Sequence, residues 1–120
     1  MIAAIVLTVL FAALVAFQLA LAAGVPWGRA AYGGSVDRLG TRFRVASVVA
    51  ALIWSAAAVI VLGRGGVIEV PISGILIWVV VILCALGIVA NAITRSRIER
   101  AIWLPFSLIV TTLGVVVAFN

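Results

Sequence analysis

Four long apolar stretches dominate the chain, and short polar connections separate them. The stretches cover residues 2–25, 45–63, 72–94 and 101–119. As a helix, each stretch is long enough to cross the roughly 30 Å hydrocarbon core of a bilayer. Helices are the expected form, because backbone groups within hydrocarbon must find their hydrogen-bond partners inside the same segment. The pattern predicts an all-α integral membrane four-helix bundle, with residues 1–120 forming a single transmembrane domain.

Capping signals extend two of these stretches into the polar connections. Ser35 suits an N-cap, which starts the second helix near residue 36. Ser96 and Glu99 have the spacing of a capping box, which starts the fourth helix near Arg97. The expected helices are residues 2–25, 36–63, 72–94 and 97–119.

Composition supports a lipid environment. Hydrophobic residues make up 68% of the chain, whereas a soluble domain is nearer half apolar. The net charge is +5, and all eight basic residues are arginines. They cluster beside the apolar stretches, which is typical of juxtamembrane anchors and argues against nucleic acid as a partner.

The distribution of arginine predicts the orientation. The first and third connections contain seven arginines, whereas the second contains only Arg64. Cytoplasmic loops are enriched in basic residues, so the first and third connections should face the cytoplasm. Both termini are then outside (N-out/C-out), in a multi-pass protein of the cell inner (plasma) membrane. The seven are Arg29, Arg38, Arg42, Arg44, Arg95, Arg97 and Arg100.

The residue types in the sequence give little support for an enzyme. The chain has no histidine, a single cysteine and three acidic residues, which fall in connections or at helix ends. No acid–base pair, nucleophile–base pair or metal cluster can be assembled from these residues. We therefore expect no enzyme activity, metal or cofactor. Proton-coupled transport normally uses an ionisable residue inside the membrane, and the predicted spans contain none.

Four polar side chains fall at a similar depth in the four spans, near their arginine-rich ends. They are Gln18, Ser47, Asn91 and Ser107. Amides that face hydrocarbon are costly, so we expect them to point into the bundle and find partners. Two interpretations stay open: structural hydrogen bonds between helices, or a polar pocket that opens to the cytoplasm.

The expected cytoplasmic rim is the leading candidate for a binding surface. Guanidinium groups form paired hydrogen bonds with phosphate and carboxylate, so anionic lipid headgroups fit this surface. Further candidate partners are another membrane protein and a second copy of the chain. The rim residues selected are Trp27, Asp37, Asn91, Arg97, Glu99, Arg100 and Trp103.

Two patches carry a resemblance to a known group of proteins. They are Pro26-Trp27-Gly28, and residues 91–100 followed by Trp103 and Pro105. They resemble small, uncharacterised four-helix integral membrane proteins of high-GC bacteria. The resemblance implies no activity, but it implies that the cytoplasmic face holds the distinctive residues.

These patterns favour a non-catalytic inner-membrane protein that acts as an accessory or partner-binding subunit through its basic rim. The alternative is an uncoupled transporter or channel for a small solute, formed by the bundle or by an oligomer. Flux through the region of Gln18 and Asn91 would need no buried charge.

Overall fold

The computed structural model describes residues 1–36 and 38–120 and, within them, contains helices but no strand. Each of four α-helices in this part of the chain is long and apolar enough to cross a membrane. The predicted all-α fold with four membrane-length helices is therefore confirmed for these residues. The elements are α1 (Ile2–Ala22), the short 3-10 helix η1 (Gly28–Ala30), α2 (Thr41–Arg64), α3 (Gly74–Ile93) and α4 (Arg97–Phe119).

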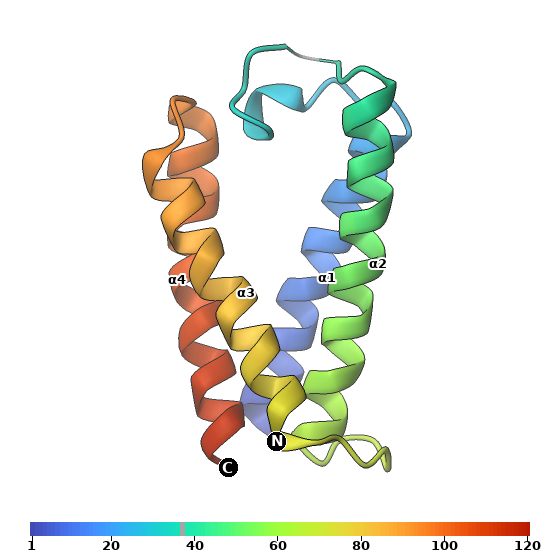
Figure 1. The fold of residues 1–120 in the computed structure, drawn as a ribbon, viewed down its shortest axis with the longest axis vertical. Coiled ribbons are helices and arrows are strands. Elements are labelled where there is room, and N and C mark those ends of the chain that lie inside the picture. The colour runs from blue at the N-terminus through green and yellow to red at the C-terminus, as the bar shows by residue number, and fades with distance from the viewer. Residues whose placement is uncertain (37) are drawn as a thin grey trace.

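The helices form two antiparallel pairs. Helix α1 packs along α2, and α3 packs along α4, because a connection between consecutive helices brings neighbours together. The two pairs meet mainly through α1 and α4, whereas α2 and α3 share few contacts. Figure 1 shows the pairs close together near the two termini and further apart near η1.

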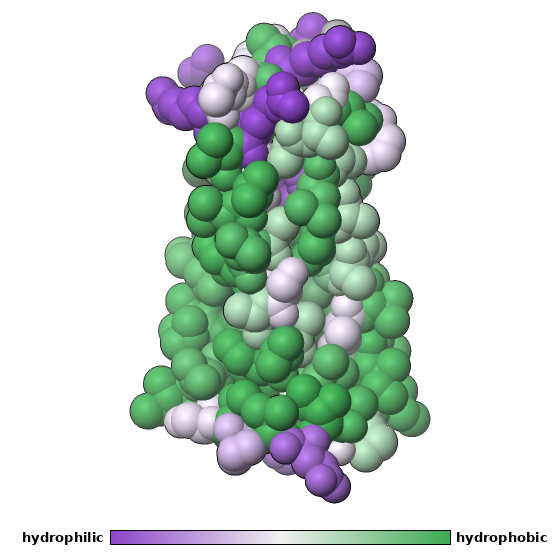
Figure 2. Space-filling view, turned by 90° about the vertical axis from the view of Figure 1, so that its right-hand side faces the viewer, coloured by the Kyte–Doolittle hydropathy of each residue, from purple (hydrophilic) through white to green (hydrophobic). Residues whose placement is uncertain are grey.

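The two ends of the bundle differ in charge. The arginine-rich end carries the first connection with η1, the start of α2, and the connection from α3 into the start of α4. Seven of the eight arginines belong to these segments. The terminal end carries both termini and the connection that contains Arg64 (Figure 1). Figure 2 shows an apolar girdle between polar ends. The longest axis measures 41 Å, enough to exceed a hydrocarbon core of roughly 30 Å.

The sides of the bundle are apolar. Large side chains on every long helix are exposed, among them Val9, Leu52, Leu86 and Ile109. Such an extensive apolar surface is unfavourable in water and suits contact with lipid chains.

The main hydrophobic core lies in the half of the bundle near the terminal end. All four long helices contribute to it, and Phe11, Leu7 and Ile77 are its largest fully buried members. Close backbone approach helps to pack this half. A Cβ atom added at Gly65 would overlap the Cβ of Ala4, so α1 meets the end of α2 where a side chain is missing.

A smaller apolar cluster holds the first connection against the bundle. Leu21, Ala31 and Leu39 are buried together, with Phe17 and Phe43 packed around them. Leu39 is buried in this cluster, and the residue after it, Gly40, has an extended backbone and serves as the N-cap of α2. This explains why α2 begins at Thr41 and not near residue 36, as the Ser35 cap predicted.

Among the other helix ends, the end of α1 and the start of α3 differ from the sequence expectation by two or three residues, and the end of α2 and the end of α3 by one. Helix α1 ends at Ala22, because Gly24 adopts a left-handed φ of 96° and turns the chain. Helix α3 begins at Gly74, where the Ser73 hydroxyl accepts a hydrogen bond from the Ile75 N–H. Helix α4 has the same range in the sequence analysis and in the structure.

Candidate functional site

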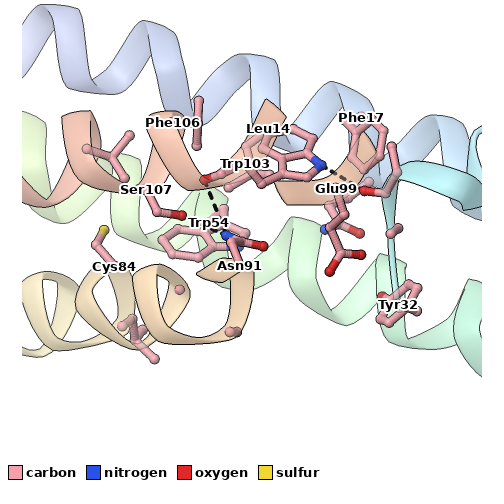
Figure 3. A pocket seen from close by; sticks show the side chains of 17 residues that line it. Leu14, Phe17, Tyr32, Trp54, Cys84, Asn91, Glu99, Trp103, Phe106 and Ser107 are labelled. Carbon is pink, nitrogen blue, oxygen red and sulfur yellow. Dashed lines mark hydrogen bonds between the residues drawn. The ribbon is translucent and has the colours of Figure 1, made fainter. Parts of the chain in front are cut away.

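A cavity of about 330 Å³ lies between the two helix pairs, towards the arginine-rich end (Figure 3). Side chains from all four long helices and from the segment 30–32 line it. Its volume is at the lower limit for a small-molecule pocket. Five residues predicted from the sequence line the cavity: Gln18, Asn91, Glu99, Trp103 and Ser107.

The first connection folds over the cavity and docks on α4. The indole N–H of Trp103 donates to the carbonyl of Ala30 at 2.8 Å. The hydroxyl of Ser96 donates to the carbonyl of Arg29 at 2.7 Å. Gly34 lies against Ser96, where an added Cβ would come within 2.6 Å of the hydroxyl oxygen. These contacts join the two helix pairs at the arginine-rich end and fix the indole of Trp103.

Glu99 is the buried acid of the site, with only 8% of its surface exposed. The Ser96 hydroxyl accepts from the Glu99 N–H at 3.1 Å, as the capping box predicted. In a complete capping box the Glu99 carboxylate would also accept from the Ser96 N–H. Here that N–H donates to the Thr94 hydroxyl. The carboxylate of Glu99 instead accepts from the N–H of Gly33 at 3.1 Å. Glu99 therefore faces the cavity and the roof formed by the first connection.

The predicted intramembrane polar residues separate into three places. The amide nitrogen of Asn91 donates to the Ser107 hydroxyl at 2.7 Å and to the Trp103 carbonyl at 3.3 Å, which joins α3 to α4. Ser47 pairs with the hydroxyl of Tyr32 at 3.0 Å. The side-chain oxygen of Gln18 is buried on the cavity wall, with no hydrogen-bond partner among the described residues.

Several rim residues lie outside the cavity. Trp27 is exposed and stacks on Phe17, with ring centroids 6.2 Å apart. Arg97 is exposed, and the guanidinium of Arg100 donates to the carbonyl of Thr94 at 3.0 Å. Asp37 lies outside the described residues. The structure thus brings Asn91, Glu99 and Trp103 together but leaves Trp27, Arg97 and Arg100 on the surface.

Aromatic side chains form much of the wall, and the sequence analysis did not select them. Phe17, Tyr32 and Phe106 all line the cavity with Trp103. Phe17 and Trp103 pack with centroids 4.8 Å apart, and Phe106 meets Trp103 edge-on at 5.1 Å. Aromatic residues near a membrane interface ordinarily indicate an anchoring belt, so their convergence on one cavity had no local sequence signal.

Known proteins give no further guide to the site: no family model, curated protein or solved structure matches the chain. Within the described residues, no group of three or more histidine, cysteine or acidic side chains gathers in a way that could hold a metal.

Proposed function

We propose that the chain is a non-catalytic protein of a bacterial inner membrane that binds a small ligand at its arginine-rich end, as an accessory or partner-binding subunit. The convergence of Asn91, Glu99 and Trp103 on one cavity is the observation that carries this proposal. These residues come from α3 and α4, and the first connection covers them. A connection needed only for topology has no reason to bury a carboxylate.

The proposed orientation places this cavity on the cytoplasmic side. Both termini lie at the end opposite the seven arginines (Figure 1), as the N-out/C-out orientation requires. Exposed Arg42, Arg95 and Arg97 surround the same end. In this orientation they would contact the anionic headgroups of the inner leaflet.

A second candidate function is uncoupled passage of a small solute. The cavity extends along the bundle from Glu99 to Cys84 and Val110, so it reaches the middle of the helices. Beyond that depth the core around Phe11 closes the path. Passage would require the two helix pairs to separate at the terminal end, where they are most closely packed.

Filling the cavity tests the ligand-binding proposal. Ala90 lines the cavity and is exposed on α3, so Ala90→Phe should obstruct it without disturbing the core. Val89→Phe is the matched control, because Val89 is exposed on the same helix away from the cavity. Native mass spectrometry of protein purified from its membrane measures the bound molecules.

We expect the parent and Val89→Phe proteins to retain the same bound molecule and Ala90→Phe to lose it. Equal retention by all three proteins, or no bound molecule in any, would contradict the proposal. For the second candidate, passage of a neutral solute into liposomes containing the parent protein, blocked by Ala90→Phe, would favour transport over binding alone.

A further inference from the structure

The cavity wall holds several polar groups, and two of its donors are already used inside the protein. The Trp103 indole N–H binds the Ala30 carbonyl, and the amide nitrogen of Asn91 binds Ser107. Two acceptors on the wall are open to a ligand. The side-chain oxygen of Gln18 has no partner within the described residues, and that of Asn91 points away from Ser107 (Figure 3).

Glu99 adds a negative charge to these acceptors. An ionised carboxylate offers about four acceptor positions, and among the described residues the side chain of Glu99 receives one bond, from the Gly33 N–H. Guanidinium groups close to this site donate to backbone carbonyls: that of Arg29 to Gly34 and that of Arg100 to Thr94. Within the described residues, no arginine forms an ion pair with Glu99. A buried carboxylate without a cation is costly, so the site is suited to receive one.

The aromatic wall favours the same kind of ligand. Aromatic faces attract ammonium groups through the negative potential above the ring, most strongly where water is excluded. Trp103 and Tyr32 line the cavity together with Glu99. The bond to Ala30 fixes the Trp103 ring, so little rotational freedom remains to be lost on binding.

The rest of the cavity is apolar and reaches the side of the bundle. Trp54, Cys84 and Val110 line its deeper part. Leu83 and Ala90 line it too, and both are exposed on the surface that faces lipid in a membrane. The cavity can therefore receive a molecule from the bilayer, where α2 and α3 share few contacts.

We propose that this cavity binds an ammonium compound with an apolar body, the ammonium group lying between Glu99, Gln18 and the aromatic wall. The inference rests on the proposed ligand-binding function and names the class of ligand. The surface arginines do not oppose it decisively, because water and salt screen exposed charges over about 8 Å. Glu99 lies inside the cavity and is screened less.

The inference is tested with three probes that share one apolar body: 2-cyclohexylethylammonium, 2-cyclohexylethanol and cyclohexylacetate. Their binding to the protein in neutral maltoside micelles is followed by tryptophan fluorescence, since Trp54 and Trp103 line the cavity. We expect the ammonium to bind at least about tenfold more tightly than the alcohol, with the carboxylate weakest. Glu99→Gln should remove this preference, because its amide still accepts from Gly33 but carries no charge.

Glu69→Gln is the matched control, since Glu69 is exposed at the terminal end and should leave the preference intact. If Glu99→Gln does not fold, the comparison of probes on the parent protein still decides. Equal binding of ammonium and alcohol, abolished for both by Ala90→Phe, would overturn the ammonium inference and leave the ligand-binding proposal standing. No probe binding, together with no bound molecule in the purified parent, would overturn both.

Two sources could supply the ammonium group: a membrane lipid such as phosphatidylethanolamine, or a free amine. Nanodiscs of phosphatidylglycerol, with and without phosphatidylethanolamine, distinguish them. If the lipid is the source, its presence should weaken probe binding, and native mass spectrometry should find it retained by the parent but not by Glu99→Gln. If a free amine is the source, probe binding should be the same in both nanodiscs. Either result supports the ammonium chemistry, provided that the parent binds the ammonium probe in the nanodiscs without phosphatidylethanolamine. Failure to bind it there would overturn the inference.

Discussion

The half of the bundle near the termini and the half near the arginines are built from the same four helices but enclose different interiors. Near the termini, apolar side chains such as Phe11 and Val61 are fully buried in the main core. Near the arginines, the helix pairs separate around a cavity that contains Glu99 and Asn91. In the first half packing decides stability. In the second, hydrogen bonds hold the helices while part of the interior stays unfilled, which is the arrangement expected of a binding site.

The orientation of the two halves gives the largest expected effect, because a reporter is either on the correct side of the membrane or inactive. A reporter active only outside the cytoplasm should work when fused after Asn120 and fail when inserted at Gly34. The reason is the excess of arginine at the end that carries Gly34. A cytoplasm-specific reporter provides the control, and its activity at Asn120 would reverse the proposed orientation.

Packing in the terminal half predicts the next largest effect. Gly65→Ala places a Cβ against the Cβ of Ala4 and should destabilise the protein by about 2 kcal/mol, within the range for overpacked sites. Gly40→Ala is the control, because no described residue other than its chain neighbours comes within 4 Å of its added Cβ and its φ is −70°. Thermal unfolding in detergent measures both. Similar stability of the two variants would show that α1 and α2 are less closely packed at this end.

The polar contact in the arginine-rich half predicts a smaller effect. Asn91→Ala and Ser107→Ala each break the 2.7 Å hydrogen bond between α3 and α4. A double-mutant cycle should give a coupling energy of about 1 kcal/mol, as interhelical hydrogen bonds in membranes contribute modestly. Additive effects in unfolding measurements would mean that the two side chains do not stabilise each other. Ligand binding by Asn91→Ala then tells whether Asn91 also serves the cavity.

The sequence by itself determined the four apolar helices and the position of the charged ends. Span length and the need to satisfy backbone groups in lipid are local constraints, so each helix could be predicted from its own residues. The Ser96 cap was predictable for the same reason, since it joins residues three apart. The start of α2 was not, because burial of Leu39 depends on residues of α1 and the first connection.

Only the tertiary structure decided what the polar residues do. Glu99 meets Gly33, which lies 66 positions away, and Trp103 meets Ala30, 73 positions away. Gln18 and Asn91 share a depth in the sequence pattern, yet Asn91 finds Ser107 while the oxygen of Gln18 has no partner among the described residues. Periodicity gives the depth and face of a side chain along its own helix. Its neighbours depend on how the helix pairs diverge and where the first connection docks, and both follow from contacts between segments distant in the sequence.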